Sequence, residues 1–401
     1  MHVVADTTTL VTDGIITSNQ AEVLKQRSRQ VMVGLAINTL LCLGILSATG
    51  GLIFWLKDAL AVAICGAVAV GIGLAILSRK VEHLRMFGNA ATLIGAGMLV
   101  GGGTLELVDK YEAVAGPVLA VSGLVLWPVA LQAFRRNVLG AAFVVGSIAV
   151  MGLAVHLFGI GFAIERWSLA GLPVSLFYLY ASVALVASGW VLDVRLVSAL
   201  AILPFAQMLD TGTFYTHAVY AFYSPEATLS IVQMSLLVAA CVWFMKTRQE
   251  RTARHARIIA VLAFVTANLC ALVGSLWGDV VGETIWGPTR PEGWSSETWE
   301  LYQQELDAFR ETAMTIPEGA FSILWTIALV AVALWTAHRN MRGLFNTALV
   351  FGVIHAYTQL FESFGDEPLA YVIGGFILIP VAWGIWQMDQ ALQKRSENST
   401  G

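Results

Sequence analysis

Long apolar stretches, separated by short polar connections, fill most of the chain. Each stretch holds about 20 residues, the length that a helix needs to cross the hydrocarbon core of a bilayer. The pattern predicts an all-α, polytopic membrane bundle of about 12 transmembrane helices. The predicted spans are 31–52, 59–78, 87–107, 113–133, 138–160, 170–191, 196–217, 227–245, 258–278, 319–337, 343–362 and 369–388.

Three polar segments interrupt or flank the spans. Residues 1–30 are expected to form a cytoplasmic helical segment, and residues 389–401 a cytoplasmic tail. The first nine helices occupy 31–278, and the last three occupy 319–388. Between them, residues 279–318 form an acidic connection that we expect on the periplasmic side.

The N-terminal segment carries a helix-start signal. Thr17 is followed at the third position by Gln20, the spacing of a capping box. We therefore expect a helix that begins here and runs into the first span. No cleavable signal peptide is expected, because no early apolar run precedes a cleavage site.

The acidic connection 279–318 contains a predicted amphipathic helix. Ser296 is the expected N-cap, and Pro291 and Pro317 lie on either side of the helix. Such a helix can lie on the membrane, cover a cavity or dock a partner. Its apolar face consists of Trp299, Tyr302, Leu306, Phe309 and Ala313, of which the first four are candidate partner-docking residues.

The positions of Lys and Arg predict the orientation. With the N-terminus inside, every inside connection contains at least one basic residue, as the positive-inside rule requires. Both termini are therefore predicted in the cytoplasm, in a bacterial inner membrane. Only five of the 23 basic residues then fall outside: Lys57, Lys110, Arg166, Arg290 and Arg310.

Composition agrees with a membrane protein. The chain is 57% hydrophobic and 12% charged, about half the charged fraction of soluble domains. Twelve spans use nearly the whole chain, which leaves no room for a soluble catalytic domain. No nucleotide-binding, nucleic-acid-binding or cofactor motif is found, and no cofactor is predicted.

Two further patterns concern the arrangement of the spans. Residues 196–225 are interrupted by Pro204, Asp210 and Gly212, so this stretch is either one kinked helix or a broken one. Spans three, seven and eleven each begin with an arginine, which would fit a threefold repeat of four helices. The third span is also rich in glycine, including Gly97 and Gly101 in a GxxxG motif, which favours close helix packing.

Ionisable side chains inside the spans are the candidate functional residues, because burying them in a bilayer is costly. In the predicted topology they all lie in the outer half of their spans. His355, Gln359 and Glu362 share one helical face, as Gln207, Asp210 and His217 do if that helix is continuous. The ligand-binding candidates are Glu106, Asp210, His217, His355, Gln359 and Glu362, with His156 and Glu318 nearby.

These residues have alternative interpretations. Glu106, Glu318 and Glu362 could simply end their spans near the headgroups. A metal site would need converging ligands such as His217, His355 and Glu362, and no metal is predicted. The inside cluster Arg248, Arg251, Arg254, His255 and Arg257 fits the topology and anionic lipid headgroups better than nucleic acid.

Short segments at both ends of the chain carry a resemblance. They are Gly14–Ala21 before the first span, Phe361–Gly365, and Gly374-Gly375 in the last span. They resemble bacterial membrane-protein families that are known only as domains of unknown function. The resemblance implies a multi-pass protein of the bacterial inner membrane, and it implies no activity and no functional residue.

Two function classes follow from these patterns. The first is a transporter-like or small-molecule-binding protein with a polar pocket, open to the periplasm, between spans three, seven and eleven. Replacing His355 or Glu362 should then alter binding and leave folding intact. The second is a non-catalytic accessory or scaffold subunit that docks a protein partner through 279–318. An intramembrane enzyme would need a pair of acids, for which only Glu106 and Glu362 are available.

Overall fold

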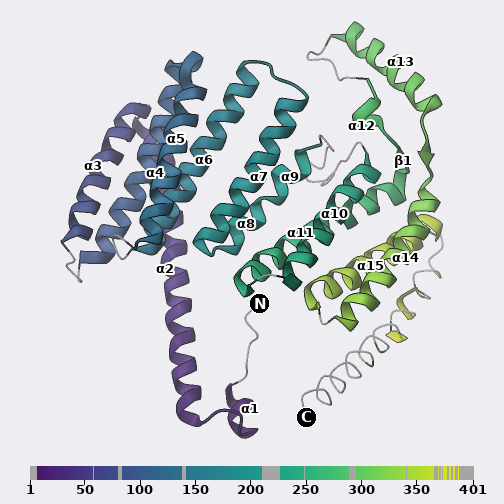
Figure 1. Cartoon of the computed structure of the whole chain (residues 1–401), viewed down its shortest axis with the longest axis horizontal. Coiled ribbons are helices and arrows are strands. Elements are labelled where there is room, and N and C mark those ends of the chain that lie inside the picture. The colour runs from purple at the N-terminus through teal and green to yellow at the C-terminus, as the bar shows by residue number, and fades with distance from the viewer. Residues whose placement is uncertain are drawn as a thin grey trace. The chain divides into compact units, whose positions relative to one another are not determined.

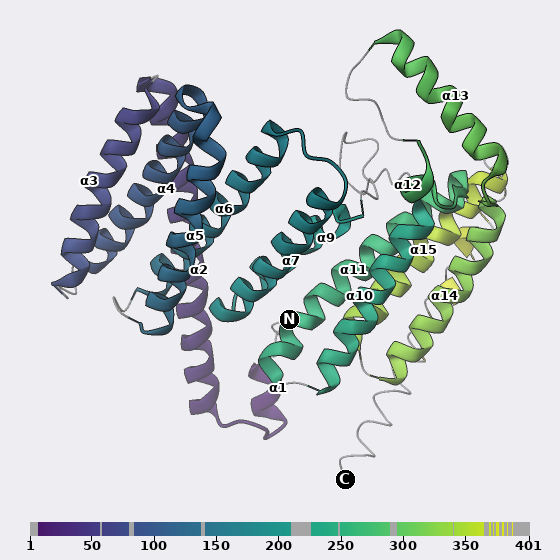
Figure 2. The same cartoon turned by 45° about the horizontal axis from the view of Figure 1, so that its top comes forward.

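The computed structural model of the chain is almost entirely helical (Figures 1 and 2). It describes residues 7–56, 58–79, 84–137, 141–209, 226–247, 249–288, 295–339 and 341–364, and separate positions between 369 and 387. Two compact units are present, with the division after Ser168. Each unit is described by itself.

The described residues of unit 1 form six helices: α1 (Thr7–Thr12), α2 (Ser18–Leu56), α3 (Ala59–Ser78), α4 (Arg85–Lys110), α5 (Glu112–Arg135) and α6 (Ala142–Arg166). The most extensive contacts join α3 to α4 and α5 to α6. The expected capping box is confirmed at the start of α2. Thr17 N–H donates to Gln20 Oε1 (2.9 Å), and Gln20 N–H donates to Thr17 Oγ1 (3.2 Å).

Glycines permit the close approach of α3 and α4. A Cβ atom on Gly95 would lie 2.7 Å from the carbonyl oxygen of Gly66, and one on Gly102 would lie 2.6 Å from that of Ala59. Real Cβ atoms do not approach backbone oxygens so closely. The close packing expected for the glycine-rich third span is therefore confirmed, and it is made against α3.

Unit 2 contains the remaining elements. Its helices are α7 (Leu172–Leu192), α8 (Arg195–Leu200), α9 (Ile202–Gln207), α10 (Ala227–Thr247), α11 (Glu250–Trp277), α12 (Glu283–Trp286), α13 (Ser296–Thr312), α14 (Glu318–His338) and α15 (Arg342–Phe364). Helix α11 is central, because it contacts α7, α8, α9, α10, α14 and α15. Its many Ala, Ser and Thr side chains are buried, which lets neighbouring helices approach it.

A small appendage joins α11 to α14. Strand β1 (Asp279–Val280) pairs antiparallel with β2 (Thr315–Ile316), and α12 and α13 lie between the two strands in the sequence. Arg310 on α13 forms an ion pair with Glu283 on α12 through two contacts of 3.0 and 3.1 Å. The expected amphipathic helix is present, although its N-cap is Ser295, whose hydroxyl accepts from Thr298 N–H at 3.2 Å. Ser296 is instead the first helical residue, because the extended backbone at Ser295 places that side chain over the first turn.

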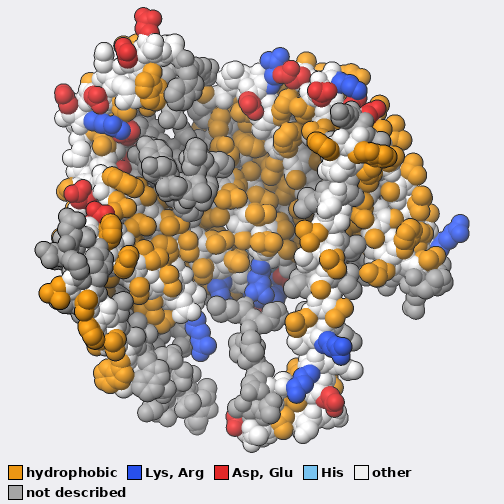
Figure 3. Space-filling view, turned by 180° about the vertical axis from the view of Figure 1, so that it is seen from behind, with side chains coloured by type: hydrophobic (Ala, Val, Ile, Leu, Met, Phe, Trp, Pro, Cys, Tyr) orange, Lys and Arg blue, Asp and Glu red, His pale blue; other side chains and the backbone are white. Residues whose placement is uncertain are grey.

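Nine of the described helices are long and apolar enough to cross a membrane. They correspond to the predicted spans two to six and eight to eleven. The first predicted span lies within α2, and the twelfth, 369–388, falls largely outside the described residues. In a space-filling view, apolar side chains cover much of the visible described surface, and charged side chains are sparse (Figure 3). Nothing in the described part establishes the threefold repeat, which stays a prediction.

The predicted seventh span is described as far as residue 209. Helix α8 ends at Leu200 and α9 begins at Ile202. Ala201 between them keeps a right-handed helical backbone (φ −62°, ψ −19°), and its N–H donates to the Ser198 carbonyl oxygen (3.2 Å), so Arg195–Gln207 is one short apolar helix that is tightened at Ala201. Asp210 and the rest of the span lie outside the described residues, so the choice between a kinked and a broken helix stays a prediction.

Candidate functional site

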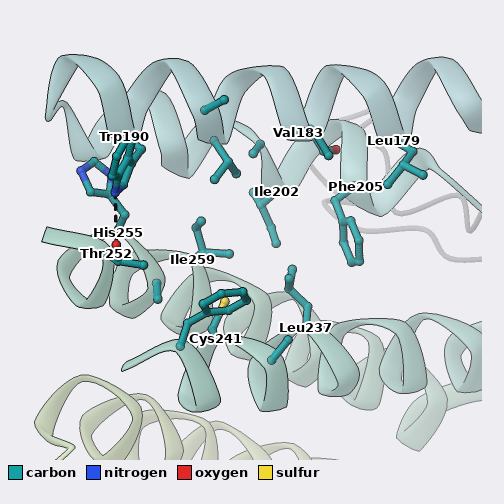
Figure 4. Close-up of a pocket in the computed structure, with 17 residues that line it drawn as sticks. Leu179, Val183, Trp190, Ile202, Phe205, Leu237, Cys241, Thr252, His255 and Ile259 are labelled. Carbon is teal, nitrogen blue, oxygen red and sulfur yellow. Dashed lines mark hydrogen bonds between the residues drawn. The ribbon is translucent and has the colours of Figure 1, made fainter. Parts of the chain in front are cut away.

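A cavity of about 430 Å³ lies within unit 2, between α7, α9, α10 and α11. Figure 4 shows Leu179 and Val183 on α7 opposite Leu237 and Cys241 on α10, with Ile202 and Phe205 between them. Nearly all of the lining is aliphatic or aromatic. The volume lies within the range of natural small-molecule pockets.

Helix α7 supplies one wall of the cavity because six of its side chains recur at helical spacing. They are Leu179, Ser182, Val183, Val186, Ala187 and Trp190. The segment Arg195–Gln207 supplies another part, since Ala201, Ile202 and Phe205 all line the cavity. The first part of the predicted seventh span therefore shapes the cavity.

Polar groups gather at one end of the cavity. Trp190 donates its indole N–H to Thr252 Oγ1 on α11 at 3.2 Å, and both side chains line the cavity beside His255 (Figure 4). This indole N–H has found a partner, as amphipathic aromatic side chains usually require. The cavity therefore has an apolar body and one polar end.

His255 joins that end to a chain of hydrogen bonds. Its ring is buried, with Nε2 3.1 Å from Asp193 Oδ1 and Nδ1 2.8 Å from Ser198 Oγ. Because a carboxylate accepts only, the neutral ring carries its proton on Nε2 and donates to Asp193. Nδ1 then accepts a hydrogen bond from the hydroxyl group of Ser198. The chain links the end of α7, α8 and α11.

Two arginines on α11 complete this polar cluster. Arg254 Nη2 donates to Asp193 Oδ2 at 3.1 Å, and Arg251 Nη2 donates to the carbonyl oxygen of Val191 at 2.7 Å. Arg251 also lies over the ring of Trp190, with its Cζ atom 5.0 Å from the ring centroid. A guanidinium over an indole is a favourable cation–π arrangement. Arg251 therefore contacts Trp190, which lines the cavity, whereas Arg254 is linked to the lining residue His255 through Asp193.

The environment lowers the pKa of Asp193 below its ordinary value of 3.8. Desolvation by burial acts in the opposite direction and raises the pKa of this carboxyl. The hydrogen bond from His255, and the charges of Arg254 and Arg251, outweigh that effect. Asp193 is therefore ionised at neutral pH, and it holds the two arginines near the cavity.

The Ser198–His255–Asp193 chain has the residue types of a hydrolase triad, but its geometry differs. In such triads serine contacts Nε2 and the carboxylate contacts Nδ1, whereas here the two nitrogens are exchanged. Ser198 is fully buried, and its Oγ lies against the Cα side of Gly189, where only glycine leaves room. A nucleophile must reach its substrate, so Ser198 serves here to position His255.

The residues predicted to bind a ligand do not line this cavity. Glu106 lies in α4 of unit 1 and forms an ion pair with Lys110 at 2.8 Å. His156, also in unit 1, is buried with Nδ1 2.7 Å from the carbonyl oxygen of Ala120. Glu318 begins α14 and is exposed. Asp210 and His217 lie outside the described residues.

His355 lies in a different buried network of unit 2. Its Nε2 is 2.8 Å from Thr326 Oγ1 and 3.1 Å from the carbonyl oxygen of Ser322, and its ring lies 4.3 Å from that of Trp325. The indole of Trp325 donates to Asn268 Oδ1 at 2.8 Å. His355 therefore helps to join α11, α14 and α15.

The rest of the predicted polar face of α15 is more exposed. Gln359 is half-buried and Glu362 is exposed, although both lie on the same helix as His355. Within the described residues, no group of three or more His, Cys, Asp or Glu could hold a metal ion.

The candidate docking residues on α13 form the less exposed face of that helix. Leu306 is 5% exposed, and Trp299, Tyr302 and Phe309 are half-buried. Trp299 and Tyr302 contact each other, with 5.5 Å between ring centroids. The open face of α13 is instead acidic, and its exposed acids are Glu297, Glu300, Glu305, Asp307 and Glu311.

Sequence reasoning did not find the cavity or its polar end. It treated Arg251, Arg254 and His255 as topology signals, and it did not consider Asp193 or Ser198. The signal that was present is the placement of Asp193 directly after an apolar span, next to a basic cluster on the same predicted side. The pairing itself joins residues about 60 positions apart, for which a pattern of hydropathy contains no information.

Comparisons of the chain with protein-family models, with curated proteins and with solved structures found no match. The nine long apolar helices in the described part place it in the class of multi-pass membrane proteins.

Proposed function

We propose that this chain is a small-molecule-binding, transporter-like membrane protein whose binding site is the cavity between α7, α9, α10 and α11. The observation that carries the proposal is the cavity itself, about 430 Å³ in volume and almost entirely apolar except at one end. Binding sites typically combine an apolar body with a few placed polar groups. Trp190, Thr252 and His255 are such groups.

The short apolar helix beside the cavity supports a transporter-like role. Short, interrupted apolar helices border the substrate sites of many secondary transporters. Here Arg195–Gln207 is such a short apolar helix, and its residues Ala201, Ile202 and Phe205 line the cavity. The binding site differs from the periplasmic polar pocket expected from sequence, because its polar groups lie at the end of α7 that the Lys and Arg pattern assigns to the cytoplasm. The same pattern supports a location in a bacterial inner membrane, with both termini inside.

A photolabelling experiment tests the proposal. The protein would be placed in phosphatidylcholine nanodiscs with a long-chain alcohol that carries a diazirine in its chain, and labelled peptides would be mapped by mass spectrometry. We expect label on the cavity-lining parts of α7, α10 and α11. Label spread evenly over lipid-facing helices, without enrichment at the cavity, would contradict the proposal.

A matched pair of substitutions sharpens this test. Ala239 and Ala240 are neighbouring exposed positions on α10, but only Ala240 lines the cavity. Ala240→Trp should fill the cavity and reduce cavity labelling at least fivefold, whereas Ala239→Trp should not. Equal labelling of the two variants would show that the probe does not occupy the cavity.

A second function is favoured by the appendage 279–316. The β1–β2 pairing and the Arg310–Glu283 ion pair hold α13 to the end of the bundle, with its acids exposed. We propose that this surface, if the protein is an accessory subunit, docks a basic partner on the periplasmic side. Changing Glu297, Glu300 and Glu305 to Lys should then abolish co-purification of that partner. Undiminished recovery would exclude this surface as the docking site.

A further inference from the structure

The cavity is a slot rather than a round chamber. Its lining residues on α7 run from Leu179 to Trp190, about 16 Å along the helix axis. Several of them are exposed although they line the cavity, including Val183 at 59% and Leu179 at 40%. The slot therefore opens along its side. A long, narrow, apolar slot of this kind fits a flexible hydrocarbon chain better than a compact molecule.

The polar end of the slot lies where the apolar spans end. Helix α7 ends at Leu192, directly before Asp193, and Arg251 and Arg254 lie in the first turns of α11. In a bilayer these positions correspond to the boundary between hydrocarbon and headgroups. A chain in the slot would therefore bring its own headgroup to the arginines.

The two arginines have hydrogen-bonding capacity left for such a headgroup. Each guanidinium has five N–H donors, and within the described residues both use only Nη2 in hydrogen bonds. The Nε atoms of Arg251 and Arg254 are buried, so this capacity lies on their Nη atoms. Both side chains are more than one third exposed. Among the described residues, Asp193 is the only acid that forms an ion pair with them, so these three residues together have a net positive charge.

We propose that the slot binds an anionic lipid, with its acyl chain in the cavity and its phosphate against Arg251 and Arg254. This inference rests on the proposed function and names the ligand class for the same site. Arginine pairs bind phosphate oxygens through strong, directional hydrogen bonds. Basic pockets between transmembrane helices on the cytoplasmic side are suited to anionic headgroups, and the Lys and Arg pattern assigns this end to the cytoplasm.

Photolabelling with two matched lipids tests the headgroup. Phosphatidic acid and phosphatidylcholine with the same diazirine-bearing acyl chain would each be added at low mole fraction to phosphatidylcholine nanodiscs. We expect phosphatidic acid to label the α7 and α11 walls about tenfold more strongly, since each nearby basic residue contributes to anionic lipid binding. Equal labelling by the two lipids would overturn the assignment.

Substitutions then identify the residues responsible. Arg251→Gln with Arg254→Gln should remove the preference for phosphatidic acid, whereas Arg257→Gln, on an exposed position of the same helix, should keep it. A preference that is unchanged in the double arginine variant would overturn the proposal.

Three further outcomes separate the possible sources of failure. If millimolar inorganic phosphate abolishes phosphatidic acid labelling, the site recognises a free anion, and the lipid assignment is overturned. If the neutral alcohol probe labels the cavity in an Ala240-dependent manner but neither lipid is preferred, the proposed function stands and the headgroup inference fails. If the neutral probe also fails to label the cavity, the proposed function fails as well.

Discussion

The side chain of Asp279 caps the start of α10, directly after Glu226, and the side chain of Glu226 caps the start of α12, shortly after Asp279. Asp279 accepts hydrogen bonds from Ala227 N–H (3.1 Å) and Thr228 N–H (2.7 Å) at the start of α10. Glu226 accepts from Gly282 N–H (2.8 Å) and Thr284 N–H (3.1 Å) at the start of α12. Both carboxylates are buried, and each satisfies backbone donors that helix starts leave unpaired. This reciprocal pair fixes the beginning of the appendage to α10.

Removing either charge should destabilise unit 2. Glu226→Gln or Asp279→Asn weakens charge-assisted hydrogen bonds in a buried setting, for which we expect a loss of about 1–3 kcal/mol in the free energy of unfolding. Unfolding experiments on the purified variants in mild detergent measure this loss in the free energy of unfolding. Glu300→Gln, on the exposed face of α13, is the control and should be neutral. If the two buried variants are as stable as this control, the pair does not hold the appendage.

Two glycines on α4 should respond oppositely to the same change. Gly95→Ala places a Cβ 2.7 Å from the Gly66 carbonyl oxygen, so α3 and α4 must separate, at a cost of about 1–3 kcal/mol. Gly103→Ala meets nothing within 4 Å and should be neutral or stabilising by up to about 1 kcal/mol, because alanine is the better helix former. If the two substitutions change the free energy of unfolding by the same sign and size, the observed packing of α3 on α4 is contradicted.

The lowered pKa of Asp193 predicts a pH dependence. Because the folded state binds this proton less readily than the unfolded state, Asp193 stabilises the fold at pH values above its ordinary pKa of 3.8. That contribution is lost as the pH falls from there through the lowered pKa. The difference in melting temperature between wild type and Asp193→Asn should therefore be constant from pH 7 to about 5 and shrink below pH 4. A difference that grows on acidification would contradict the assigned contacts.

His355 and Glu362 should differ sharply, although the sequence places them on one face. His355→Ala removes a buried ring that packs on Trp325 and hydrogen-bonds to Thr326, so we expect a loss of about 2–4 kcal/mol. Glu362→Gln alters an exposed side chain and should change stability by less than about 0.5 kcal/mol. Thermal unfolding of the two variants distinguishes these outcomes. A fully stable His355→Ala variant would restore the sequence-based expectation that folding is unaffected.

Hydropathy and local spacing were sufficient for much of the helical architecture. The nine apolar helices match predicted spans, and the Thr17–Gln20 capping box was predictable because its two residues are close in sequence. Contacts between distant segments were not predictable. Asp193, Ser198 and His255 meet only because α7, α8 and α11 pack together, and Glu226 meets Gly282 only through the fold of the appendage.

The candidate site shows the same limit more strongly. Ionisable residues in apolar spans were the reasonable candidates, yet His355 contributes to packing and Glu106 to an ion pair with Lys110. The cavity is lined mainly by residues such as Val183 and Ile259, which any apolar helix contains. An irregular helix can be suspected from Pro204, but the tightening at Ala201 and the contribution of Ile202 and Phe205 to the cavity depend on three-dimensional packing.

Native mass spectrometry of the untagged protein, released gently from its own membranes, tests directly whether the cavity holds a ligand. We expect a reproducible lipid-sized adduct on wild type and on Ala239→Trp, and its loss from Ala240→Trp, which fills the cavity. An adduct of equal abundance on all three proteins, or a bare chain throughout, would contradict a ligand in this cavity.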